Sequence, residues 1–287
     1  MRSYDVAARL DDVHEVVDAF GAKHGDARLS EVGDAFEEGT GSQVSAGMED
    51  AAPLVRTFDV DAQLFLEDVD FLVSGERLCR EQPRASEGGT PDHHGINAVA
   101  AEGIEFAFIR VGYRGYGEAG TLCEDSTAVS NLRAAKAADL QVGTYFFSQA
   151  LNEEEARQEA ALVLRVIEES GVSPDLPLMY DPELIRDDEG RANGITREQV
   201  ARNTAAFRDE VESASPWTAD IYANLPWEDA YFDGDTLNQY DIWYADYEPK
   251  PQTPYHFTWW QYTNEGSAPG IEGPVDLNLW IRRAPGG

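Results

Sequence analysis

Near the start of the chain, apolar residues recur every three or four positions, at Val6, Leu10, Val13, Val17 and Phe20. This spacing places them on one face of a helix with acidic residues opposite, and the pattern continues to about residue 38. A polar stretch rich in Gly and Ser follows, so we expect residues 1–50 to form a helical extension and a linker. Residues 51–94 mix short β-prone runs with Gly- and Pro-rich turns, which predicts an irregular segment.

After Gly95 the pattern changes, and apolar runs of strand length alternate with amphipathic helices. The predicted strands are 104–111, 142–147, 176–180, 219–223, 241–244 and 257–261. The predicted helices are 131–139, 153–170 with Asn152 as N-cap and a stop at Gly171, and one that starts at an N-cap on Thr196 and ends near 213. Such repeats over about 190 residues predict an α/β fold, a parallel barrel with its active site at the carboxyl ends of the strands. Because a barrel without its first strand leaves backbone unpaired, we expect part of 51–94 to supply that strand.

Composition narrows the classes of function. The chain has 42% hydrophobic and 10% aromatic residues, which is enough for a packed core. It carries 22 basic and 54 acidic residues, a net charge of -32, and its only lysines are Lys23, Lys136 and Lys250. Nucleic-acid binding needs a basic face, so we expect no nucleic-acid partner. An acidic surface of this kind indicates solubility and tolerance of salt.

Cysteine content and hydropathy exclude further classes. Cys79 and Cys123 lie far apart and outside any metal-binding spacing, so we expect neither a disulfide framework nor a zinc site. The N-terminus has no apolar stretch of signal-peptide length, and no segment approaches the roughly 20 apolar residues that cross a bilayer. The sequence therefore predicts no membrane association and shows no signal for export.

The residues that follow the predicted strands are the candidates for chemistry: Tyr113, Ser148, Gln149, Asp181, Glu183, Asn224, Asp246 and Gln261. Asp181 and Glu183 are two apart on an extended chain, so both carboxyl groups should face the barrel mouth. Two carboxyl groups crowded in a half-buried cleft do not both ionise easily, which provides the acid and the carboxylate of a glycosidase. Aromatic residues crowd the last third of the chain and could stack on sugar rings, although we assign about half of them to the core.

Several stretches resemble glycoside hydrolase family 25, the Chalaropsis-type lysozymes or N-acetylmuramidases, over about residues 95–282. They are GIEFAFIRVGYRGYG at 103–117, VGTYFFSQ at 142–149, YDPE at 180–183, IWYADY at 242–247, WQYT at 260–263 and GIEGPVDLN at 270–278. The resemblance implies a modified, flattened TIM-like barrel that cleaves the β-1,4 bond between N-acetylmuramic acid and N-acetylglucosamine in peptidoglycan. It also implies that no metal or organic cofactor is needed, and that the protein acts outside the cell or in the cell wall. We expect a monomer.

The resemblance also assigns roles to single residues. Glu183 matches the general acid, Asp181 the carboxylate beside it, and Asp276 the acid of the final motif. Tyr145, Tyr222, Trp243 and Gln261 fall where the family lines its sugar cleft, and Tyr113 is expected near them from its place at the end of a strand.

One motif of the family is missing. Its first strand normally ends in Asp-x-Ser, whereas this chain has PDHHGINAVAA at 91–101. Asp92 and Asp70 are the candidates to replace that carboxylate. His93 and His94 are interpreted as a surface pair on a loop.

Three hypotheses remain open. The first is an active muramidase, and the second is a catalytically impaired barrel that binds cell-wall glycan. The third is another barrel glycosidase, acting on a soluble glycan.

Overall fold

The computed structural model describes residues 58–66, 93–101, 103–183, 185, 190–268, 271 and 275–283. Within these ranges only the backbone is described for 58–66, 93–95, 229 and 282–283. The expected helical extension in 1–50 lies outside the described residues. So do Asp70 and Asp92, the two candidates for the missing carboxylate.

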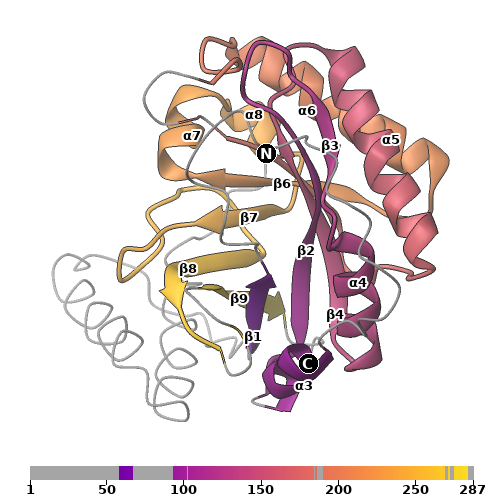
Figure 1. Cartoon of the computed structure of the whole chain (residues 1–287). Helices are drawn as coiled ribbons and strands as arrows, with labels where there is room; N and C mark the ends of the chain where they lie inside the picture. Colours follow the sequence, from indigo (N-terminus) through magenta and orange to yellow (C-terminus); the bar gives the residue numbers. More distant parts are fainter. Residues whose placement is uncertain are drawn as a thin grey trace, which may run out of the picture.

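Within the described residues, nine strands form one sheet that closes on itself. They are β1 (Phe58–Leu66), β2 (Phe106–Arg114), β3 (Leu122–Glu124), β4 (Gln141–Ser148), β5 (Leu178–Pro182), β6 (Ala219–Asn224), β7 (Ile242–Ala245), β8 (Trp259–Gly266) and β9 (Val275–Arg283). The sheet order is β1-β9-β8-β7-β6-β5-β4-β2-β3, and β1 also pairs with β2. In Figure 1, β1 lies between β2 and β9, at the seam of the barrel. The predicted α/β barrel is confirmed.

The strands are not all parallel, which corrects the expectation of a parallel barrel. The strands from β4 to β8 and the pair β2–β4 run parallel, but β9 is antiparallel to both β8 and β1. A parallel crossover needs about a dozen or more residues, and the connection between Gly266 and Val275 is shorter than that. Because β9 returns directly beside β8, none of the described helices lies between these two strands in the chain.

The long helices cover the outer face of one half of the barrel, as Figure 1 shows. They are α4 (Ala128–Ala137), α5 (Glu153–Ser170) and α6 (Arg197–Ala214), and the short ones are α3 (His93–Ala101), α7 (Leu225–Ala230) and α8 (Gly234–Leu237). The side chain of Asn152 accepts the N–H of Glu155 at 3.0 Å, and Gly171 ends α5 in the left-handed region at φ 67°. These signals set both ends of α5 as predicted. The sequence predicted turn structure through His94. The end of that prediction is wrong, because α3 begins at His93.

Alternating side chains on β2 separate the barrel interior from the layer under the helices. Phe106 and Phe108 join an interior cluster with Tyr145, Leu176, Met179, Tyr222, Trp243, Ala245 and Trp259. Ala107, Ile109 and Val111 join the outer cluster that packs against α4, α5 and α6. A second outer cluster, which includes Trp227, Tyr244 and Trp260, packs under α7 and α8. The interior is therefore filled by aromatic rings rather than open as a pore.

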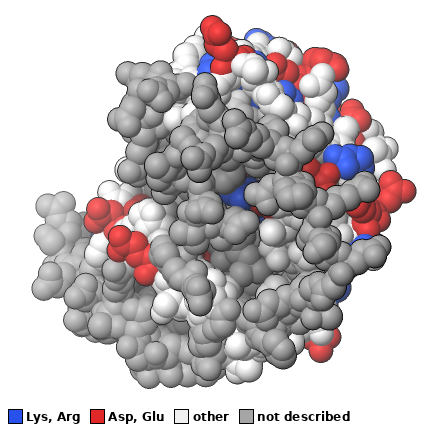
Figure 2. All heavy atoms as spheres, in the orientation of Figure 1, with Lys and Arg blue, Asp and Glu red and all other residues white. Residues whose placement is uncertain are grey.

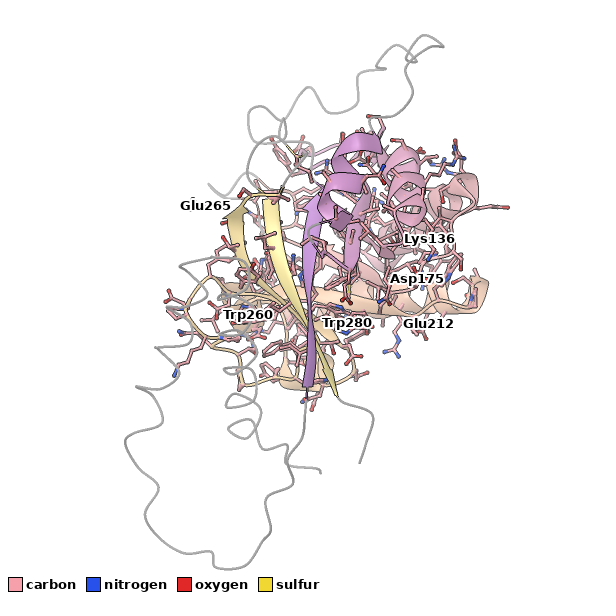
Figure 3. The ribbon with its side chains drawn as sticks, turned by 90° about the horizontal axis from the view of Figure 1, so that it is seen from below. Lys136, Asp175, Glu212, Trp260, Glu265 and Trp280 are labelled. Atoms are coloured by element: carbon pink, nitrogen blue, oxygen red, sulfur yellow. The ribbon has the colours of Figure 1, made fainter. Side chains whose placement is uncertain are left out.

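The surface reflects the acidic composition. Figure 2 shows Asp and Glu side chains spread over much of the described part of this face, with fewer Lys and Arg among them. Figure 3 shows Lys136 beside Asp175, with which it forms an ion pair. It also shows Trp260 and Glu265 near opposite ends of β8. Among the described residues, no helix has the length and apolarity to cross a membrane.

One expectation about the cysteines is wrong. Cys123 in β3 is disulfide-bonded, whereas the spacing of the two cysteines predicted no disulfide. Cys79 is the only other cysteine of the sequence.

Candidate active site

The two acids expected at the barrel mouth lie at the carboxyl end of β5. Asp181 is 5% exposed, and its backbone is in register with Phe147 of β4. Glu183 is partly exposed and follows the last residue of the strand. The buried side chain of Gln149, just after β4, donates a hydrogen bond from Nε2 to the backbone carbonyl of Glu183. Two neighbouring strands therefore fix the backbone on which these acids stand.

Gln261 links the opposite side of the mouth. Its Nε2 donates to Oδ2 of Asp276 at 2.7 Å, so an amide from β8 holds the carboxylate of β9. Its Oε1 accepts the hydroxyl of Tyr247 at 3.0 Å and that of Tyr222 at 3.4 Å. Both the nitrogen and the oxygen of the Gln261 amide therefore have hydrogen-bond partners, which fixes the orientation of the side chain.

The electrostatics of Tyr222 bring the two sides together. Burial raises the pKa of the Tyr222 hydroxyl well above its ordinary value, and the charges of Glu183, Asp181 and Asp276 raise it further, as does Tyr247. Charges act strongly on a phenol only when they lie near it. The charges of the three acids to which the resemblance assigned catalytic roles thus all act on one buried phenol, although Asp276 comes from a strand far from the other two along the chain.

Aromatic rings fill the barrel next to these acids. The Trp243 ring stacks on Phe108 at 5.3 Å between centroids and meets Tyr222 and Tyr145 edge to face at 4.8 Å and 5.8 Å. Its Nε1 donates to Oδ1 of the buried Asn278 at 2.8 Å. The structure therefore places Tyr145, Tyr222 and Trp243 in mutual contact, packed as a rigid base for the site.

Tyr113 lies beside an ion pair at the end of β2. Arg110 donates from Nε to Oδ2 of Asp125 at 2.8 Å, with both side chains buried. Burial raises the pKa of the Tyr113 hydroxyl, Arg110 lowers it and Asp125 raises it. These contacts place Tyr113 against the Arg110–Asp125 pair.

Three residues at strand ends have structural contacts that the sequence did not predict. Asn224 caps α7, because its Oδ1 accepts the N–H of Trp227 at 3.1 Å. Asp246 organises the loop after β7 by accepting the N–H groups of Glu248 and Gln252 at 3.0 and 2.8 Å. Ser148 points to α5 on the outside of the sheet. The place of a residue directly after a strand was therefore not enough to predict whether its side chain lies at the barrel mouth.

Sequence reasoning gave no individual role to two residues at this site, although Tyr247 belongs to the aromatic group that was expected to stack on sugar rings. Tyr247 is 52% exposed, and its hydroxyl is tied to Gln261 beside the acids. Asn278 is fully buried and holds Trp243. Both belong to motifs quoted above, but neither exposure nor a side-chain partner can be inferred from the motif alone. The described residues include no cluster of three or more His, Cys, Asp or Glu side chains suited to a metal ion.

Comparison with known proteins identifies the family of the chain. The model of Glycosyl hydrolases family 25 matches residues 92–271. The chain belongs to this family. The family match contains Asp181, Glu183 and Gln261 and ends a few residues before Asp276. No curated protein matches the chain.

Solved structures share the family 25 fold. The modular autolysin LytC from Streptococcus pneumoniae, solved in complex with a synthetic peptidoglycan ligand, superposes with a TM-score of 0.60 at 18% identity. That match covers 77% of this chain and 46% of LytC, so the chain spans about half the length of that relative. The spore cortex lytic enzyme SleM from Clostridium perfringens gives 0.55 at 23% identity over 63% of this chain and 62% of SleM. The lysozyme from Streptomyces coelicolor gives 0.53 at 21% identity, over 65% and 85%.

Proposed function

We propose that this chain is a peptidoglycan hydrolase of the lysozyme type, which cleaves the β-1,4 bond from N-acetylmuramic acid to N-acetylglucosamine. The observation that carries the proposal is that the charges of Glu183, Asp181 and Asp276 all act on the buried Tyr222, which Gln261 links to Asp276, in a chain of family 25. Glycoside hydrolysis needs a carboxylic acid to protonate the leaving oxygen and further negative charge to stabilise an oxocarbenium-like transition state. These three groups supply both.

The proposed mechanism gives each group one task. Glu183 protonates the glycosidic oxygen while the bond from that oxygen to the anomeric carbon breaks. Asp181 and Asp276 stabilise the positive charge on the sugar ring. Water, or first the acetamido oxygen of the substrate, then attacks the anomeric carbon, and a proton returns to Glu183 or to solvent.

The aromatic residues would bind the glycan strand. Tyr247 offers an exposed ring face next to the acids, and apolar C–H faces of sugars stack on such rings. Its hydroxyl bond to Gln261 keeps the ring in place before substrate arrives. Tyr145, Tyr222 and Trp243 support that wall from within the barrel.

The proposal is tested by digestion of purified peptidoglycan with the intact chain, with Glu183→Gln and with Glu168→Gln. Glu168 is an exposed residue in the last turn of α5, so it controls for the loss of one negative charge. The products are reduced with borohydride and identified by mass spectrometry. We expect disaccharide-peptides that end in reduced muramic acid from the intact chain and from Glu168→Gln, and none from Glu183→Gln.

Other outcomes would identify the alternatives. A folded intact chain that sediments with the wall but releases no reducing ends would be a glycan-binding barrel. Cleavage of neutral chitin-type oligomers without cleavage of peptidoglycan would indicate a glycosidase for a soluble glycan. Either result would overturn the muramidase proposal.

A further inference from the structure

A fully buried carboxylate lies on the opposite face of the sheet from the proposed catalytic acids. Glu159 in α5 is 0% exposed and faces the sheet, among helix positions that are otherwise filled by apolar residues such as Ala156 and Val163. Burying a carboxylate costs free energy, and an apolar residue of similar volume is often at least as stable. A carboxylate at this position therefore calls for a reason other than packing.

Glu159 joins three strands at their carboxyl ends. Its Oε1 accepts the Nε of Arg114, the last residue of β2, at 2.6 Å. Its Oε2 accepts the hydroxyl of Ser148, the last residue of β4, at 2.6 Å. The Ser148 oxygen also lies 2.8 Å from the hydroxyl of Tyr180, which precedes Asp181 in β5. Charge-assisted bonds to two strands and a relayed bond to a third fix their ends relative to one another.

A second set of contacts extends this network to the loop that follows β4. The hydroxyl of Ser148 accepts the N–H of Ala150 at 3.2 Å, and Glu155 of α5 accepts the N–H of Leu151 at 2.8 Å. Arg191 binds both carboxylate oxygens of Glu155, at 2.9 and 3.0 Å. Two residues one turn apart on α5 thus hold the loop: Glu159 through Ser148, before Ala150, and Glu155 through Leu151, after it.

This loop carries the residue that fixes the backbone of Glu183. The carbonyl of Gln149 accepts from Arg191 at 3.3 Å, and its side chain donates to the carbonyl of Glu183. A continuous series of contacts, buried between Glu159 and Ser148 and partly buried between Gln149 and Glu183, therefore runs from Glu159 through the loop to Glu183. We propose that Glu159 is a positioning residue that sets the place of Glu183 at the barrel mouth through Ser148 and Gln149.

The inference rests on the proposed function, because it assigns Glu183 to catalysis. The ionisation of Glu159 gives it a pH signature. Burial raises the pKa of Glu159 to about 7, although Arg114 and Ser148 lower it and Glu155 raises it slightly further. Those groups, with Tyr180 from β5, are the polar groups that face it from β2, β4, β5 and its own helix. Loss of a proton from Glu159 near neutral pH should strengthen its bond from Ser148 and so tighten the loop.

The test compares Glu159→Gln with Glu168→Gln, the same substitution at an exposed position of the same helix. With the intact chain active on peptidoglycan, we expect kcat of Glu159→Gln to fall at least tenfold, because small displacements of a catalytic group are costly, while KM changes by less than about twofold. The pH profile of kcat should also lose its transition near pH 7. Glu168→Gln should match the intact chain in all three quantities. An unchanged kcat in folded Glu159→Gln would overturn the inference.

A second measurement does not depend on activity. Amide hydrogen exchange followed by mass spectrometry reports how firmly residues 149–151 and the backbone after Pro182 are held. We expect faster exchange of the Ala150 and Leu151 amides in Glu159→Gln and no change in Glu168→Gln. Unchanged exchange in both variants would refute the positioning role even if no form cleaves peptidoglycan. An inactive intact chain with faster exchange in Glu159→Gln would refute the proposed function alone.

Discussion

Replacement of Arg114 by Met should destabilise the fold by an amount that depends on pH. The Arg114–Glu159 pair is almost fully buried, with side chains 4% and 0% exposed. The other two nitrogens of Arg114 donate to the backbone carbonyls of Gly120 and Glu155, at 2.9 Å each. Arg114→Met keeps most of the apolar stem of the side chain and removes all of these bonds.

The expected loss of stability has two parts. The Gly120 carbonyl, which would lose its bond from Arg114, costs about 1–3 kcal/mol, and this part is independent of pH. The second part comes from Glu159, which would be left as a buried charge without its cation. Removing one partner of a buried ion pair typically costs about 3–5 kcal/mol in total when the remaining group is ionised.

The pH dependence follows from where Glu159 ionises. Its pKa is about 7 in the folded protein and near its ordinary value of 4.5 in the unfolded chain. A carboxyl group whose pKa is raised in the folded protein makes its full contribution to the free energy of unfolding below pH 4.5. That contribution is lost as the pH rises to about 7. Without Arg114 the folded pKa is higher still, so the variant continues to lose stability above pH 7 at about 1.4 kcal/mol per pH unit. The difference between the two proteins is therefore constant below pH 7 and widens above it.

Urea denaturation followed by tryptophan fluorescence measures this difference at constant ionic strength. The titrations run at intervals of one pH unit from about pH 6 to about pH 9, a range that brackets the raised pKa of Glu159. The control compares Arg114→Met/Glu159→Gln with Glu159→Gln: neither protein has the titrating group, so the penalty for losing Arg114 in this pair should be independent of pH. A penalty in Arg114→Met that is the same at every pH, or largest at the lowest pH, would refute the reasoning.

Three further predictions concern the rest of the molecule. The net charge of -32 should make the thermal midpoint rise when NaCl increases from about 0.1 M to about 2 M, and a midpoint independent of salt would show that self-repulsion is unimportant. In Gly143→Ala a new Cβ would lie 2.3 Å from Cε1 of Phe108, so urea titration should show a loss of about 1–3 kcal/mol, whereas Gly117→Ala, with open space around it, should be nearly neutral. Burial raises the pKa of Asp220 to about 7 from 3.8, so its stability contribution is present below pH 3.8 and lost by pH 7. The stability of Asp220→Asn relative to the intact chain should therefore be greater at pH 8 than at pH 4 in thermal unfolding, and equal values would contradict it.

Local signals in the sequence were sufficient for the elements whose ends are set by neighbouring residues. The bounds of α5 follow from Asn152 and Gly171, and α6 begins after its N-cap Thr196, because capping is decided within one turn. That Asp181 and Glu183 stand at the carboxyl end of β5 was also predictable from local signals, since both follow an apolar run of strand length.

Contacts between distant strands could not be predicted from those signals. Asp276 in β9 bonds to Gln261 in β8, and Tyr247 contacts the same amide from the loop after β7. The sequence places Glu159 on a helix, where a glutamate is normally exposed to solvent. Its burial is evident only from the packing of α5 on β4. Family resemblance supplied the roles of the acids, but the side chains that hold them depend on the register of the sheet.

The seam strand β1 has a consequence for how the protein is made. Leu64 pairs with Leu277 on one side and with Ala107 on the other, so β1 joins two segments from opposite ends of the described chain. During synthesis from the N-terminus, β1 and β2 leave the ribosome long before β9 exists, and both β1 and β8 keep an open edge until it arrives. Contacts of such long sequence separation slow folding and expose edges to wrong partners. The nascent chain therefore cannot complete its barrel until β9 has left the ribosome.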